Sequence, residues 1–175
     1  DYDVDGMTAS CLLASYFRSK GLAYETYIPV RTEEGYGVNS AALDQLKRNG
    51  VSLVVTVDSG ITAVEEAKYA REIGLDLIIT DHHECKKTLP DLAAISPKRP
   101  DCPYPNPGLS GVGVAFKLIC ALEKDTPIDV LFDQYGDFVA VGTVADVMPV
   151  IGENRILIRR GLAALNRKKR PGLRS

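Results

Sequence analysis

The sequence contains no long apolar run. It has 175 residues, of which 45% are apolar, but no stretch approaches the roughly 18 uninterrupted apolar residues that a membrane-spanning helix needs. This absence argues against an integral membrane protein. We expect a cytoplasmic protein without membrane contact, and the apolar content is sufficient for one globular domain with its own core.

Cysteine is scarce, and no two cysteines form a CxxC pair. The four occur at Cys11, Cys85, Cys102 and Cys120. This spacing argues against a disulfide framework and a thiolate zinc cage, and it suits a reducing compartment. Cys85 stands close to His82 and His83, so a mixed zinc site is an open alternative at this point.

Acidic residues are absent from the C-terminal end, although the net charge of the whole sequence is only −2. Residues 155–175 hold eight basic residues, whereas residues 1–154 hold the other 13 basic and all 23 acidic residues. The basic end is explained equally well as a solvated helix that runs into a linker and as a contact with a polyanion.

Two continuous apolar runs, residues 53–58 and 75–81, are typical of strands buried on both faces of a sheet. A helix between them, with Thr62 and Glu65 in capping-box spacing, completes a strand-helix-strand unit that imposes parallel pairing. We therefore predict an α/β fold: a doubly wound, mainly parallel sheet flanked by helices. Further strands are predicted at residues 24–29 and 92–96, a proline-rich loop at 97–110, and helices at 7–19, 40–49, 111–124, 137–147 (interrupted by Gly142) and 153–166.

One domain is expected over residues 1–166. Residues 167–175 have the composition of a linker, which would lead to a further C-terminal domain. Asp1 stands where a strand would just have ended. We therefore expect the sequence to be a fragment that lacks the first strand of its sheet.

Aspartates follow the predicted strands. Asp58 ends one strand and Asp81 ends the next. Asp1, Asp3 and Asp5 would follow a third strand, which we expect to precede Asp1. Ligands of open parallel sheets bind outside the carboxyl ends of the strands, so the three clusters should meet along one edge. Each cluster alone is explained as well by a helix cap or a turn. Together, however, several carboxylates repel each other unless cations hold them.

The two histidines of the sequence, His82 and His83, stand directly after Asp81. Carboxylate oxygens with a neutral imidazole suit Mn²⁺, with Mg²⁺ as the second choice because nitrogen disfavours it. Two such ions about 3.5–4 Å apart, bridged by one carboxylate, would activate water and stabilise a phosphoryl transition state. Asp58 stands between the other clusters and is the natural bridge.

Four motifs, in this order, resemble those of the DHH phosphoesterase superfamily: DYDVDG, VTVDSG, TDHH and GTVADVMP. Within that superfamily, EGYGVN, LSGVGVAFKL and GTVADVMPVIGENR closely resemble the catalytic core of the RecJ family of single-strand-specific DNA exonucleases. The resemblance extends over essentially the whole chain, and four ordered motifs are far more specific than one.

The resemblance implies a dinuclear site with five ligands, namely Asp3, Asp5, Asp58, His82 and Asp146. It implies that Asp58 bridges the two ions and that His83 contacts the scissile phosphate. Asp81 would orient the histidines, a role that metal sites commonly need. Asp1 is a further candidate ligand.

The resemblance also suggests substrate-binding residues. The SGVGV stretch, with Ser110, Gly111 and Gly113, offers small residues and backbone amides to a phosphate, although the same pattern serves tight packing. Arg31 and the EGYG turn resemble part of a substrate groove. Tyr36 would stack on a base, with plain packing as the alternative.

The resemblance implies an enzyme that hydrolyses single-stranded DNA in the 5′-to-3′ direction with two divalent metals. Such an enzyme would act in DNA repair and recombination, with repair or replication proteins as further partners. The alternatives are a phosphodiesterase acting on oligoribonucleotides or cyclic dinucleotides, a pyrophosphatase, and a non-catalytic binding module that has lost its metals.

Overall fold

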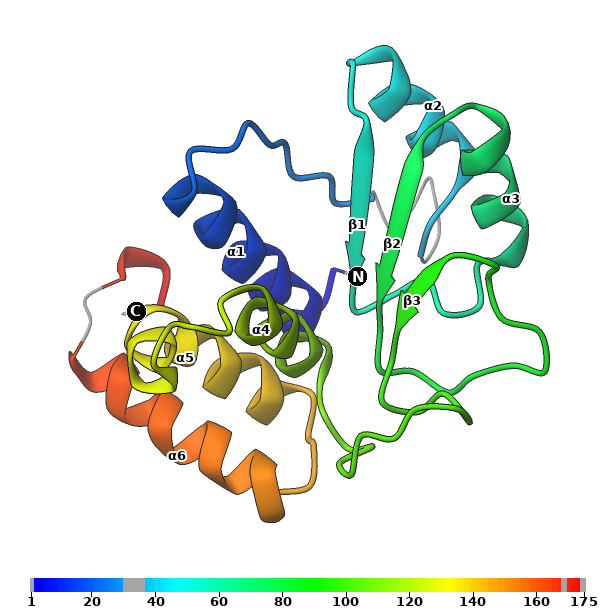
Figure 1. Ribbon diagram of the computed structural model, residues 1–175. Coiled ribbons are helices and arrows are strands. Elements are labelled where there is room, and N and C mark those ends of the chain that lie inside the picture. The colour runs from blue at the N-terminus through cyan, green and yellow to red at the C-terminus, as the bar shows by residue number, and fades with distance from the viewer. Residues whose placement is uncertain (1, 30–36, 168–169, 174–175) are drawn as a thin grey trace.

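The computed structural model describes residues 2–29, 37–167 and 170–173. A short parallel sheet stands between two groups of helices (Figure 1). The elements are α1 (Val4–Ser19), α2 (Ser40–Arg48), β1 (Leu53–Val57), α3 (Val64–Glu72), β2 (Asp76–Thr80), β3 (Ala93–Ile95), α4 (Gly111–Leu122), α5 (Ile128–Ala145), α6 (Gly152–Arg167) and the 3₁₀ turn η1 (Pro171–Leu173).

The sheet has the order β1-β2-β3, and both pairings are parallel. Val55 of β1 lies opposite Ile78 of β2, which lies opposite Ala93 of β3. The β-branched side chains of β1 and β2 favour this pleated, partly buried surface. The strands predicted at residues 53–58, 75–81 and 92–96 are thereby confirmed.

Helices cover both faces of the sheet, which confirms the predicted α/β architecture. On one face, α1, α4 and α5 form a core around Leu12, Phe116 and Val139, each at most 1% exposed. On the other, α2 and α3 bury a smaller core that includes Leu43 and Ile79. The two covered faces explain why the middle residues of β1 and β2 are apolar on both sides rather than alternating with polar residues.

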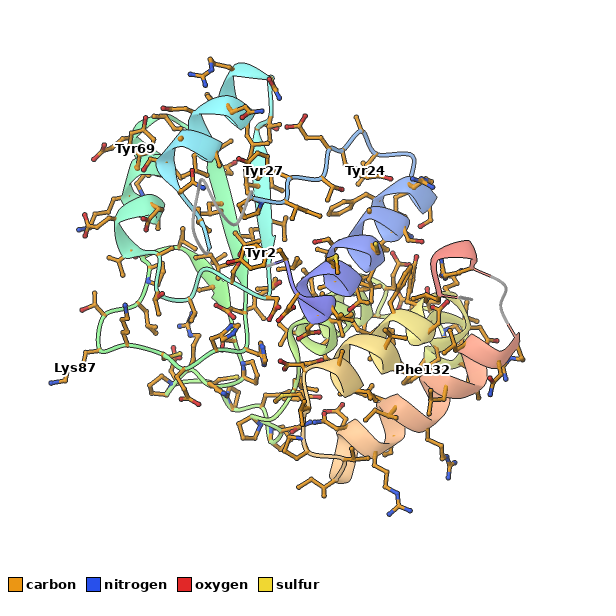
Figure 2. All side chains as sticks on the ribbon, turned by 180° about the vertical axis from the view of Figure 1, so that it is seen from behind. Tyr2, Tyr24, Tyr27, Tyr69, Lys87 and Phe132 are labelled. Carbon is orange, nitrogen blue, oxygen red and sulfur yellow. The ribbon has the colours of Figure 1, made fainter. Side chains whose placement is uncertain are left out.

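The strand predicted at residues 24–29 is wrong. This segment has no assigned secondary structure. The ring of Tyr24 packs against Phe17 of α1 at 6.2 Å, and the Tyr24 hydroxyl accepts a hydrogen bond from Arg18 at 2.9 Å. Figure 2 shows Tyr24 beside this helix. A groove of about 760 Å³ is lined by residues of this segment and of β1.

Two predicted helix signals also need correction. Thr62 does not cap α3, because the helix begins at Val64 with Ala63 as its N-cap and no side-chain capping bond. Ile61, the residue before Thr62, is buried, and its backbone amide donates a hydrogen bond to Asp81. The helix therefore begins after Thr62 rather than at it. Gly142 does not interrupt a helix: α5 is continuous from Ile128 to Ala145.

The residues after α6 pack back onto the helical layer. The Arg170 guanidinium pairs with the fully buried carboxylate of Asp137 on α5 and lies 4.3 Å from the Phe138 ring centre. Leu173 contacts the core of α1, α4 and α5. In the described part of the chain, no helix has the length and apolarity required to cross a bilayer.

Candidate metal centre

Carboxylates from three parts of the chain surround one imidazole at the carboxyl edge of the sheet. The Nε2 atom of His82 lies 3.0 Å from Asp58 Oδ1, 3.6 Å from Asp146 Oδ2 and 3.8 Å from Asp5 Oδ2. Asp5 belongs to the first turn of α1, Asp58 follows β1, His82 follows β2 and Asp146 follows α5. The structure thus brings together four of the five predicted ligands.

These side chains form two overlapping sets of candidate ligands among the described residues. One set is Asp5, His82 and Asp146, and the other is Asp58, His82 and His83; within each set the ligand atoms lie within 4.8 Å of one another. Asp5, Asp58 and His82 are each at most 5% exposed. Buried carboxylates this close together are stable only with a cation or with bound protons.

Asp5 is fixed by the N-terminus of α4. Its carboxylate accepts hydrogen bonds from the backbone amides of Gly111 at 2.5 Å and Val112 at 2.9 Å. The Gly113 amide donates to the Ser110 side chain at 3.2 Å, and Ser110 also pairs with Thr143 at 2.9 Å. The prediction that Gly111 and Gly113 offer free amides to a phosphate therefore needs correction, because these donors already serve the metal centre and the helix cap.

Two glycines permit the close packing of the site. An ideal Cβ at Gly111 would lie 2.5 Å from the Asp58 Cβ, and one at Gly142 would lie 2.7 Å from Asp5 Oδ1. Any larger side chain would push a candidate ligand aside. Gly142 of α5 was not identified as a site residue from the sequence, although a glycine inside an apolar helix is costly and indicates close approach of another group.

Asp81 organises the loop that carries both histidines. Its Oδ1 accepts hydrogen bonds from the backbone amides of His82 and His83, and its Oδ2 accepts one from Ile61. The His83 Nδ1 lies 2.8 Å from Oδ1 as well. Asp81 is 1% exposed and is absent from both candidate ligand sets. Its contacts agree with the predicted role of orienting the histidines.

The backbone is strained at two points of the site. Asp58 and Val147 have φ angles of 57° and 55°, the only positive values among the described non-glycine residues. Such conformations are unfavourable, above all for a β-branched residue such as Val147, and they persist where the surroundings enforce them. Val147 directly follows Asp146, so both strained positions serve the placement of a carboxylate.

Burial sets the charges of the site. Loss of solvation, and then the charge of Asp58, raise the pKa of Asp5 to about 7. Burial likewise raises the pKa of Asp58 and of Asp146. For His82, burial opposes the charged form, but the hydrogen bond and charge of Asp58 prevail and raise its pKa. Without metal, the site therefore holds protons that the unfolded chain would release.

We expect the stability of the chelator-treated protein to fall as the pH rises from about 4 to 7. In this window native Asp5 keeps a proton that the unfolded chain has lost, so the free energy of unfolding decreases with pH. The raised pKa of His82 likewise lowers the free energy of unfolding as the pH rises further. With Mn²⁺ bound, the free energy of unfolding should instead increase with pH, since the ion competes with these protons for the carboxylates and the imidazole.

Thermal unfolding at several pH values, with chelator and with Mn²⁺, measures both slopes. Asp5→Asn is the control, because it should remove the part of the pH dependence that the Asp5 carboxyl contributes to the metal-free protein. Equal slopes with and without Mn²⁺ would show that the cluster does not exchange protons for metal.

Other predicted site residues lie at the edge of the centre or beyond it. Asp3 is exposed, and its Oδ1 accepts the Gly6 amide at 2.9 Å as the N-cap of α1. Asp3 is in neither ligand set, but its charge raises the pKa of Asp58 and Asp146. The residues predicted to bind metal or substrate at Asp1, Arg31 and Tyr36 lie outside the described residues.

Comparisons with known proteins identify the family of the chain. The pattern of the DHH family, N-terminal domain, matches residues 1–143. The single-stranded-DNA-specific exonuclease RecJ of Bacillus subtilis (strain 168) is 47% identical over 175 residues, which are 99% of this chain and 22% of that protein.

Two crystal structures share the fold. One is of exonuclease RecJ bound to manganese, with a TM-score of 0.87 and 37% identity, covering 99% of this chain and 44% of that one. The other is of RecJ in complex with Mn²⁺ from Thermus thermophilus, with a TM-score of 0.80 and 34% identity, covering 99% and 25%. The chain thus spans less than half the length of these relatives. With the family pattern matched over residues 1–143 and the DHH motif at the centre of the site, the chain belongs to the DHH family.

Proposed function

We propose that the protein hydrolyses phosphodiester bonds in single-stranded DNA with two divalent metal ions, Mn²⁺ by preference and Mg²⁺ as the alternative. The observation that carries this proposal is the ring of three carboxylates around His82 Nε2. The relatives named single-stranded-DNA-specific exonuclease, and their manganese-bound structures, support it.

The residues present fit a metal centre. Asp146 Oδ2 is buried without a hydrogen-bond partner among the described residues, and it points toward His82 Nε2 at 3.6 Å. Oxygen and imidazole donors are the set that Mn²⁺ accepts. Asp5, Asp58, His82 and Asp146 would hold the metal. Bound divalent ions would supply an activated water nucleophile and neutralise the charge that develops on the phosphate.

His83 is suited to contact the substrate. Its side chain is 46% exposed, unlike that of His82, and its Nδ1 is fixed to Asp81 at 2.8 Å. The hydrogen bond to Asp81 raises the pKa of His83, which favours the protonated ring. A ring oriented in this way can present a positive N–H to a phosphate oxygen at the mouth of the site.

The 5′-to-3′ polarity, cytoplasmic location, contacts with repair or replication proteins and the linker at residues 167–175 stay predictions from the sequence. The relatives are several times longer than this chain, so the substrate groove is proposed to include other parts of the protein. Extended single strands need long basic and aromatic surfaces, and residues 1–175 alone are expected to bind DNA weakly.

We expect the full-length protein with Mn²⁺ to degrade an end-labelled single-stranded DNA at least about tenfold faster than a matched duplex, a dinucleotide or pyrophosphate. Excess chelator should abolish the activity, and added Mn²⁺ should restore it. If the dinucleotide or pyrophosphate were hydrolysed faster than the single-stranded DNA, the protein would instead be a phosphoesterase of small substrates. Absence of all four activities in a folded protein that binds no Mn²⁺ would favour a binding module.

A further inference from the structure

The GENR stretch at the start of α6 has no role in the site described so far. Within it, Asn154 is 2% exposed and lies on the first turns of that helix. An asparagine at a helix N-terminus commonly accepts hydrogen bonds from the amides of its own helix. Asn154 does something different. Its side-chain NH₂ group donates to the carbonyl of Gly108 at 2.6 Å and to that of Pro149 at 3.1 Å.

The two carbonyls belong to two loops that support the metal centre. Gly108 stands two residues before Ser110, the N-cap of α4, and the next two amides of α4 hold Asp5. Pro149 stands three residues after Asp146. The amide of Asn154 therefore joins the loop that supports one candidate ligand to the loop that carries another.

Neighbouring contacts strengthen this connection. The Asn154 Oδ1 accepts a hydrogen bond from Asn106 at 3.2 Å, so the whole side-chain amide is used. The adjacent Glu153 accepts the Tyr104 hydroxyl at 2.8 Å and pairs with Lys117 of α4 at 3.1 Å. The proline-rich loop is thus tied to both α6 and α4, although it has no regular structure of its own.

The loop after Asp146 needs such support. Val147 is in the left-handed region and is 86% exposed, so its side chain contributes little packing energy. Strained backbone persists only where the surroundings fix it. The buried Asn154 side chain provides a fixed point, because it bonds to this loop at Pro149 and to the loop before α4 at Gly108.

We infer that Asn154 is a positioning residue of the metal centre, which sets the distance between Asp146 and Asp5. This inference rests on the proposed function, because it needs the carboxylate cluster to bind metal. Residues that hydrogen-bond directly to metal ligands typically contribute about 10–100-fold to metal affinity. Asn154 bonds to the loops next to the ligands, so we expect an effect at the lower end of this range.

The test is Mn²⁺ titration by calorimetry on the full-length protein and its Asn154→Ala variant. The variant should bind Mn²⁺ about tenfold more weakly. Its kcat should recover at saturating Mn²⁺, because every candidate ligand is still present. Asn106→Ala removes the donor to Asn154 Oδ1, and with it the contacts of Asn106 to Glu153 and to the Gly108 amide. It should weaken Mn²⁺ binding in the same direction by a smaller factor.

Leu157→Ala is the matched control for stability. Leu157 lies on the same helix, is 3% exposed and packs in the helical core. Its truncation should lower the unfolding temperature at least as much as Asn154→Ala, with Mn²⁺ affinity unchanged. Wild-type Mn²⁺ affinity in Asn154→Ala would overturn the inference. Failure of the wild-type protein to bind Mn²⁺ would instead remove the proposed function itself.

Discussion

Asp58→Asn is expected to lower Mn²⁺-dependent hydrolysis by about a thousandfold or more, because metal ions supply several kcal/mol of transition-state stabilisation and each 1.36 kcal/mol is a factor of about ten in rate. Among the three carboxylates around His82 Nε2, that of Asp58 is the nearest, at 3.0 Å, and Asp58 is fully buried. Asparagine is the better replacement than alanine, since it tolerates the positive φ of this position.

The fold should survive this substitution. Burial raises the pKa of Asp58, so its charged form is a cost in the metal-free protein. Without metal, the unfolding temperature of Asp58→Asn should equal or exceed that of the wild type, while the stabilisation by Mn²⁺ should be lost. Asp76→Asn, an exposed aspartate at the opposite end of the sheet, is the control that should change neither property. Activity near the wild-type level in Asp58→Asn would refute the two-metal assignment.

Gly142→Ala should impair both stability and metal binding. The added methyl group would lie 2.7 Å from Asp5 Oδ1 and from Val112 Cγ1, and it would also meet the Thr8 hydroxyl. Overpacking of this kind costs typically about 1–3 kcal/mol. Because the clash falls on a candidate ligand, we expect Mn²⁺ affinity to fall about tenfold or more as Asp5 is displaced.

Gly136→Ala separates the two effects, since it places a methyl group on the same helix. Its nearest contacts are Phe132 at 3.1 Å and Gly161 at 3.3 Å, away from the metal centre. It should change the unfolding temperature and leave Mn²⁺ affinity unaltered. If Gly142→Ala loses stability but binds Mn²⁺ like Gly136→Ala, the close approach to Asp5 has no bearing on the metal.

The sheet and most helices could be predicted from the sequence because their signals are local. The segments that form β1 and β2 are short and rich in β-branched apolar residues. Ser110 is the N-cap of α4, and its side chain accepts a hydrogen bond from the Gly113 amide. The convergence of Asp5, Asp58 and His82 could also be predicted, since the carboxyl ends of parallel strands share one edge.

Tertiary contacts account for the features that the sequence did not reveal. Residues 24–29 have a strand-like composition, but contacts of Tyr24 with α1 hold them elsewhere. Gly142 lies far from Asp5 in the sequence, so only the folded chain shows why a glycine is needed there. The Gly111 amide was expected to face a substrate phosphate, but it donates to the carboxylate of Asp5, 106 residues away.

The carboxylates around His82 are proposed to form a dinuclear metal centre. Anomalous diffraction at the manganese absorption edge, from crystals of the full-length protein grown with Mn²⁺, tests it most directly. Two manganese peaks should flank the Asp58 carboxylate, and both should be absent from crystals of Asp58→Asn. A fully ordered site without manganese, or manganese bound only away from Asp58 and His82, would contradict it.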